Sequence, residues 1–101
     1  MLELFATVDA ILVPATPRNA PAIGQKRFVL DGRELPVRSA SRHLYAADLV
    51  HRLPVVVVPL PLEPLPIGVQ IIAAPWREDI ALRIAYALEQ SGVCVAPRPS
   101  F

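Results

Sequence analysis

Prolines divide the most apolar stretch of this chain, residues 53–75, into short pieces. The stretch reads LPVVVVPLPLEPLPIGVQIIAAP, and Glu63 is its only charged residue. Its length suits a transmembrane helix, which needs about 20 apolar residues. Its six prolines exclude that helix, because each interior proline costs a helix about 3 kcal/mol and a single span has no neighbouring helix to satisfy the freed backbone groups.

Two β-branched runs remain between these prolines, at residues 55–58 and 67–73. Neither run alternates polar and apolar residues, which predicts two strands covered on both faces, with Val57 buried. The connection over residues 59–66 is too short for a crossover helix. We therefore expect the two strands to pair antiparallel.

The amino-terminal half predicts a strand, a loop and a hairpin. The apolar run at 9–13 predicts a buried strand, and the prolines and glycine that follow predict an irregular loop over 15–25. Asp31-Gly32 lies between two β-prone runs and is typical of a tight hairpin turn. Pro36 is tolerated only on an edge strand, so we expect this hairpin, at about 27–38, to be peripheral.

Two helices are predicted from apolar residues at four-residue spacing. Residues 42–52 form the first, with Tyr45 and Leu49 on its apolar face, and residues 78–91 form the second. The second helix places Ile80, Ile84 and Leu88 on one face, and Asp79 is spaced to pair with Arg83. Gly92 suits a left-handed residue after this helix, and residues 93–96 are compatible with a short edge strand.

Composition favours one small domain, residues 1–101, with apolar surface to spare. Hydrophobic residues make up 53% of the chain and charged residues 19%. This apolar content is high for a domain with so small an interior. We therefore expect apolar surface that faces a partner. The net charge of +1 favours neither a nucleic acid nor an anionic membrane. A single cysteine excludes an internal disulfide, no secretion signal is visible, and we expect a cytoplasmic protein.

No residue pattern in the chain predicts a catalytic, metal or cofactor site. His43 and His51 can share a helix face with Asp48 between them, but a metal site needs further ligands, so a solvated face is favoured. Ser39 or Ser41 would form a nucleophile with Lys26 only if the fold brought them together. Two further single residues are interpreted as structural: Cys94 as a buried inert thiol and Trp76 as a packing anchor.

Four segments resemble, in order, the carboxy-terminal part of amidase signature enzymes. They are DAILVPATPRNAPAIG (9–24), LPVVVVP (53–59), LPIGVQIIAAPWRED (65–79) and LRIAYALE (82–89). The family has a strand ending in P-x-T-P, an L-P-x-x-x-V-P strand, an L-P-x-G-x-Q strand and a final helix. FVLDGRELPVR and IIAAPWREDIALRIA most resemble the branch that acts on urea-like substrates, such as carboxybiuret and allophanate hydrolases.

The resemblance implies an α/β fold, with a small mixed β-sheet and two main helices as in the carboxy-terminal part of the family's α/β/α fold. It implies amide hydrolysis by a serine, a second serine in a cis peptide and a lysine, which the family carries in its amino-terminal and central parts. Ser39, Ser41 and Lys26 do not match those motifs, so the resemblance assigns no catalytic residue here. Arg52 stands where the family has glycine before the L-P strand.

These observations predict the carboxy-terminal piece of an amidase, inactive by itself, whose partner is the remainder of the enzyme or a second copy of the chain. An alternative hypothesis is a non-catalytic module that oligomerises through the face its parent used against the catalytic core. A hydrolase built on Ser39 or Ser41 with Lys26 is a third hypothesis.

Overall fold

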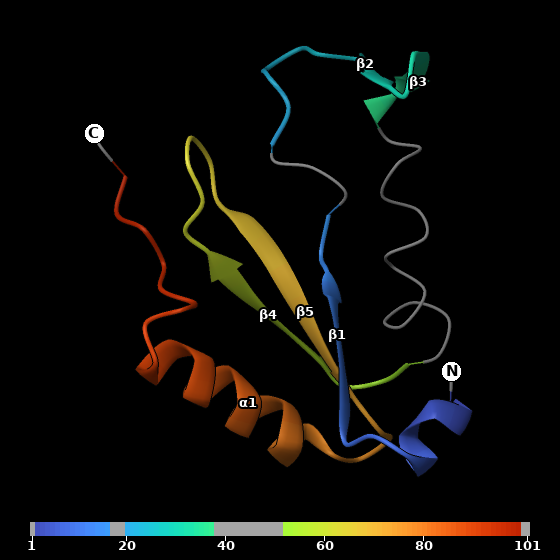
Figure 1. The fold of residues 1–101 in the computed structure, drawn as a ribbon, viewed down its shortest axis with the longest axis vertical. Coiled ribbons are helices and arrows are strands. Elements are labelled where there is room, and N and C mark those ends of the chain that lie inside the picture. Colours follow the sequence, from blue (N-terminus) through green and yellow to red (C-terminus); the bar gives the residue numbers. More distant parts are fainter. Residues whose placement is uncertain (1, 17–19, 38–51, 100–101) are drawn as a thin grey trace.

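The computed structural model describes residues 2–16, 20–37 and 52–99. In chain order its elements are η1 (Leu2–Ala6), β1 (Ala10–Pro14), β2 (Arg27–Leu30), β3 (Arg33–Pro36), β4 (Val55–Leu60), β5 (Ile67–Ala73) and α1 (Glu78–Gln90). Figure 1 shows α1 lying along one side of the sheet formed by β1, β4 and β5. The helix predicted at 42–52 lies outside the described residues.

The main sheet has the strand order β1-β5-β4, with β5 in the centre. Both pairings are antiparallel, with Leu12 opposite Ile71 and Val57 opposite Gln70. The antiparallel pairing of the two proline-bounded strands is therefore confirmed, as is the α/β class. All strand pairings among the described residues are antiparallel.

Prolines occupy outward positions on both edge strands. The amide of Ala73 donates to the carbonyl oxygen of Pro54 at 3.0 Å, and the amide of Ala15 donates to that of Gly68 at 2.8 Å. Antiparallel residues alternate between bonded and non-bonded pairs, so Pro59 in β4 and Pro14 in β1 fall in non-bonded pairs with β5. The missing N–H of each proline therefore removes no bond from the sheet.

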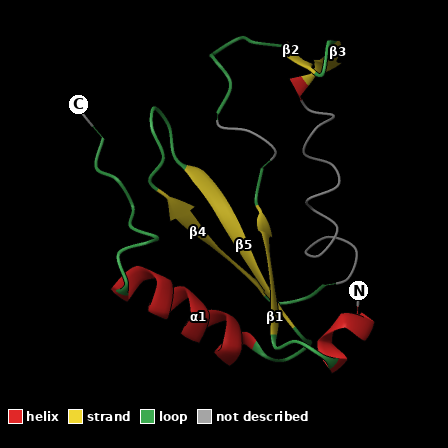
Figure 2. Cartoon of the chain, viewed as in Figure 1, coloured by secondary structure: helices red, strands yellow, loops and turns green. Residues whose placement is uncertain are grey.

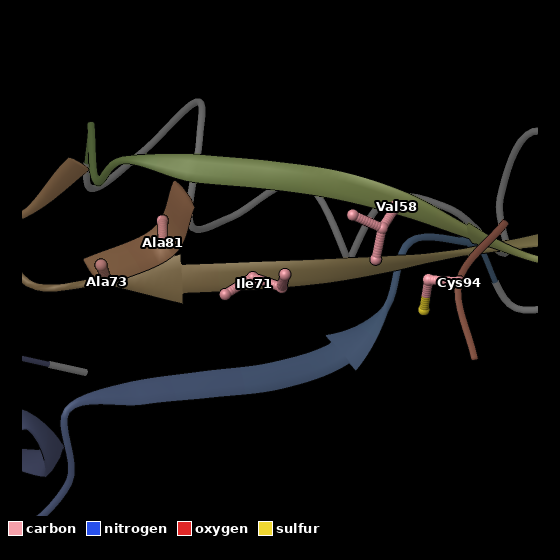
Figure 3. Close-up of a cluster of buried hydrophobic side chains, with 5 residues drawn as sticks. All are labelled: Val58, Ile71, Ala73, Ala81 and Cys94. Atoms are coloured by element: carbon pink, nitrogen blue, oxygen red, sulfur yellow. The ribbon is translucent and has the colours of Figure 1, made fainter. Parts of the chain in front are cut away.

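The core lies between α1 and the sheet (Figure 3). Ile71, Ala73 and Ala81 are fully buried there, and Val58 and Cys94 are nearly so. The helix stripe of Ile80, Ile84 and Leu88 packs against this cluster. A smaller cluster of Leu53 and Ile72, with Phe5 against it, covers part of the opposite face.

Gly68 of β5 lies where residues from both neighbouring segments approach closely, on the face of the sheet opposite α1. A Cβ at this position would lie 3.0 Å from the Cβ of Ala15 in the turn after β1 and 3.0 Å from Cγ1 of Val57 in β4. Contacts at this distance are tighter than nine in ten of those that real Cβ atoms make. Close packing, and not an unusual backbone angle, therefore favours glycine here.

The predicted hairpin is confirmed. Asp31 and Gly32 have φ values of 50° and 77°, which is the geometry that a tight turn between β2 and β3 needs. The two strands form their own sheet, and Figure 2 shows it standing apart from the main one. Among the described strands, β3 with Pro36 pairs with β2 alone, as an edge strand does.

Four local predictions are wrong. Val57 is 57% exposed, because α1 covers the other face of β4. The strand at 9–13 is only partly buried, since β1 is an edge strand. Trp76 is 88% exposed, in a turn where its φ is 66°. Residues 93–96 form no strand. Helix α1, and Gly92 in a left-handed conformation after it (φ 83°), agree with the prediction.

Candidate functional site

Most of the catalytic and metal-binding candidates from the sequence lie outside the described residues, namely Ser39, Ser41, His43, Asp48 and His51. Lys26 is described and exposed, in the loop before β2. Within residues 2–16, 20–37 and 52–99, no three His, Cys, Asp or Glu side chains are grouped as a metal site would require. The same part of the chain contains no helix with the length and apolar character needed to cross a bilayer.

Cys94 is a structural residue. Its side chain is 4% exposed and packs into the cluster beneath α1. Its amide donates to the carbonyl oxygen of Leu88 at 3.2 Å, which ties the tail to the end of the helix. The expectation of a buried thiol is confirmed, and its inertness stays a prediction.

An ion pair stands at the start of α1. The guanidinium of Arg77 donates to both carboxylate oxygens of Asp79, from Nε to Oδ1 at 3.0 Å and from Nη2 to Oδ2 at 3.1 Å. This hydrogen bonding lowers the pKa of Asp79 and raises the pKa of Arg77. The predicted pair of Asp79 with Arg83 is therefore wrong. The partner of Asp79 is Arg77, in the turn before the helix.

The flank of α1 nearer β1 borders an open hollow of about 460 Å³ with a charged lining. Asp9, Arg77 and Arg83 line it beside Ile80 and Ile84 of the helix. The described residues that line it include no serine, cysteine or histidine. This lining therefore lacks the side chains that most often serve as nucleophiles.

The flank of α1 nearer β4 borders a mainly apolar hollow of about 480 Å³. Val58 and Pro59 of β4 line it together with Leu82, Tyr86 and Cys94. Leu82 and Tyr86 are 59% and 63% exposed. The apolar surface that the helix leaves uncovered is therefore this flank. The stripe of Ile80, Ile84 and Leu88 is not part of this uncovered surface, because it packs against the chain's own sheet.

Two motifs that are distant in the sequence meet at the end of β1. The side-chain amide of Gln70 donates from Nε2 to the carbonyl oxygen of Pro14 at 3.2 Å. Gly68 bonds to Ala15 through the backbone and makes room for its side chain. Residues 14–15, which begin the P-A-T-P motif, therefore contact Gly68 and Gln70 of the L-P-I-G-V-Q motif directly. The composition of β5 marks Gln70 as its one polar side chain, but the sequence does not show which group it contacts.

Arg52 has a left-handed backbone, with φ of 52°, immediately before buried Leu53. This is the position where the amidase signature pattern has glycine. Glycine adopts positive φ without steric cost, whereas a residue with a Cβ is strained there. The departure from the pattern therefore has a conformational cost in this chain.

The sheet, its joined motifs and the helix over its face define a member of the amidase family. The chain belongs to this family, since the sequence profile called Amidase matches residues 1–82. It is 39% identical over 93 residues to AtzE, a 1-carboxybiuret hydrolase subunit of Pseudomonas sp. (strain ADP), covering 89% of this chain and 20% of that protein.

Other relatives are named for different activities. The chain is 39% identical over 98 residues to a glutamyl-tRNA(Gln) amidotransferase subunit of Dinoroseobacter shibae, covering 93% of this chain and 19% of that one. It is 35% identical over 100 residues to a fatty acid amide hydrolase of Oryza sativa subsp. indica, covering 97% and 16%. The chain thus spans about a fifth of the length of these relatives.

A solved structure has the same fold at high similarity. It comes from work on "an unexpected vestigial protein complex" that "reveals the evolutionary origins of an s-triazine catabolic enzyme". The match has a TM-score of 0.84 and 38% sequence identity, and it covers 95% of this chain and 22% of the other. The fold is therefore that of one part of a larger amidase.

Proposed function

We propose that this chain is the carboxy-terminal segment of an enzyme that hydrolyses amide C–N bonds, and that the remainder of the enzyme supplies the two serines and the lysine. The observation that carries the proposal is the near-complete match of this chain to about a fifth of each amidase relative. The lining of the charged hollow beside α1, where the described residues include no serine, cysteine or histidine, is consistent with it.

In this proposal the segment acts as one structural unit that completes the sheet of the enzyme. Its partner is the remainder of the amidase or a second copy of the chain, and its compartment is the cytoplasm. The apolar flank with Leu82 and Tyr86 and the exposed face of Val57 supply surface for such a partner. The charged hollow near β1 holds both arginine and aspartate, and it favours no nucleic acid.

Urea-like molecules are the substrate class that we propose for the complete enzyme. The similarity to the structure from the s-triazine work and to the carboxybiuret hydrolase subunit supports this class. Amidotransferase and fatty acid amide hydrolase relatives have nearly equal identities. The substrate panel must therefore include simple amides, a fatty acid amide and glutamine beside biuret-type compounds.

The test compares two preparations. The first is the chain alone, and the second is the chain produced together with the coding sequence that lies immediately upstream of Met1. We expect no turnover above buffer from the chain alone, because activated nucleophiles supply much of a rate enhancement that commonly exceeds about 10⁶. We expect amide hydrolysis from the second preparation, strongest with urea-like compounds.

Three results would contradict the proposal. Turnover by the chain alone that disappears in Ser39→Ala or Ser41→Ala would establish a self-contained hydrolase. If the joint preparation is folded but hydrolyses no amide on the panel, the proposed amidase activity of the complete enzyme is wrong. An upstream sequence without a Gly/Ser-rich stretch and a lysine would point the same way.

A further inference from the structure

Trp76 occupies the third position of a tight turn between β5 and α1. The amide of Arg77 donates to the carbonyl oxygen of Ala74 at 3.0 Å, which closes the turn over Pro75 and Trp76. The φ of Trp76 is 66°. Proline at the second position and a positive φ at the third are the pattern of a type II turn, whose third position normally holds glycine or asparagine. A tryptophan is strained there, because its Cβ crowds the backbone.

The segments on both sides of Trp76 hold this turn in its strained form. On one side, β5 ends at Ala73, which is fully buried in the core. On the other side, Arg77 is paired with Asp79, and its carbonyl oxygen accepts a bond from the amide of Ile80 at 3.1 Å. A strained backbone persists only where the surrounding structure fixes it, and such residues are concentrated at functional sites.

The described part of the chain offers the indole no compensation for this strain. Trp76 is 88% exposed, so its large apolar surface remains in water. Tryptophan contributes much of the free energy of protein–protein interfaces when it is buried at their centre, because it combines a large apolar area with a hydrogen-bond donor. Trp76 therefore has the chemistry of an interface residue and a backbone that costs stability until the side chain is covered.

Trp76 lies at the end of the sheet where the chain begins. Ala10, at the start of β1, is opposite Ala73, three positions before Trp76. Figure 1 shows η1 and the turn from β5 to α1 at this same end of the sheet. Leu2 and Leu4 of η1 are 57% and 54% exposed. In the enzyme proposed above, the upstream part is continuous with η1 and therefore enters the structure at this end.

We propose that the upstream part of the amidase covers Trp76, and that the indole is a principal contact between this segment and that part. The inference rests on the proposed function, since it takes the upstream part as the partner. The chain spans about a fifth of the length of its relatives, so the remainder is large enough to form a pocket around an indole. Continuity with η1 holds that part near Trp76 at an effective concentration of about millimolar order, which favours it over a second copy.

Oxidation by hydroxyl radicals measures the exposure of Trp76 in any preparation and needs no activity. Trp76 is the only tryptophan of the chain, and cleavage after Arg52 and Arg77 isolates it in the peptide 53–77. In the chain alone, Trp76 is expected to oxidise nearly as fast as in the urea-unfolded chain. In the chain produced together with the upstream sequence, the oxidation rate is expected to fall several-fold.

Trp76→Gly separates the strain from the contact. Glycine accepts a positive φ without steric cost, so the variant is expected to raise the urea midpoint of the chain alone. In the joint preparation the same variant is expected to lower the midpoint, because the indole contact is lost. Val29→Ala is the control, since it shortens a side chain that is 71% exposed on the hairpin. We expect the control to change both preparations equally.

Three outcomes would overturn the inference. The first is a Trp76 oxidation rate in the joint preparation equal to that in the chain alone. The second is protection of Trp76 that appears in the chain alone as its concentration rises, which would assign the contact to a second copy. The third is a Trp76→Gly variant that destabilises the chain alone or leaves the joint preparation unchanged.

The inference and the proposed function fail separately in these experiments. Protection of Trp76 in a joint preparation that hydrolyses no amide supports the inference and contradicts the amidase activity. Amide hydrolysis by a joint preparation in which Trp76 is still exposed contradicts the inference alone.

Discussion

Gln70 donates a hydrogen bond to the carbonyl oxygen of Pro14 across 56 positions of sequence. Gln70 lies in the centre of the sheet with 5% of its surface exposed, and Pro14 ends the edge strand β1. A buried amide without partners would destabilise the fold. This bond therefore both satisfies the amide and anchors the turn that follows β1.

Replacing Gln70 by leucine is expected to lower the free energy of unfolding by about 1–2 kcal/mol, because the bond to Pro14 is lost while the volume is nearly kept. Gln90→Leu, at an exposed position at the end of α1, is the control and is expected to change stability by less than about 0.5 kcal/mol. Urea unfolding measures both. Equal effects of the two variants would show that the Gln70 bond contributes nothing.

Gly68→Ala is expected to cost about 1–3 kcal/mol, because the added methyl group lies 3.0 Å from both Ala15 and Val57. Shortening Val57 to alanine removes one of the two obstructing groups. The double variant Gly68→Ala/Val57→Ala is therefore expected to be more stable than the sum of the single effects predicts. Strict additivity in thermal unfolding would contradict the close packing.

Arg52→Gly is expected to stabilise the chain by up to about 1 kcal/mol, since it relieves a left-handed backbone at φ 52°. Arg52→Ala removes the same side chain but retains the Cβ, and so the strain. We expect alanine to give no such gain. If alanine and glycine stabilise equally in urea unfolding, the guanidinium and not the backbone is the source of the strain.

The carboxylate of Asp79 is expected to titrate below its usual range, because Arg77 donates two hydrogen bonds to it. Since its pKa is lower in the folded state, its stabilising contribution is present above the ordinary aspartate pKa and is lost as the pH falls through the folded pKa. Arg77→Leu is expected to raise the pKa of Asp79, as measured by NMR titration of the carboxyl carbon.

Glu78→Gln is the control for that titration, because it removes a neighbouring charge but keeps both bonds from Arg77. We expect it to alter the pKa of Asp79 less than Arg77→Leu does. A pKa that does not respond to the loss of Arg77 would contradict the ion pair.

The sequence by itself determined the features that depend on neighbouring residues. Asp31-Gly32 predicts its turn because both residues accept positive φ, and the spacing of Ile80, Ile84 and Leu88 predicts a helix because they fall on one face. The prolines around residues 55–58 and 67–73 exclude a long helix for equally local reasons. The elements that these local signals predict are present in the structure as β2, β3, β4, β5 and α1.

Only the tertiary structure decided which surfaces meet. The sequence of β4 does not distinguish Val57, which is exposed, from Val58, which is buried, because the difference comes from the side of the sheet on which α1 packs. Gln70 finds its acceptor in Pro14 because β1 is laid beside β5 by the fold. Burial, strand order and free edges depend on segments far apart in the chain, and local preferences contain no information about which of them come together.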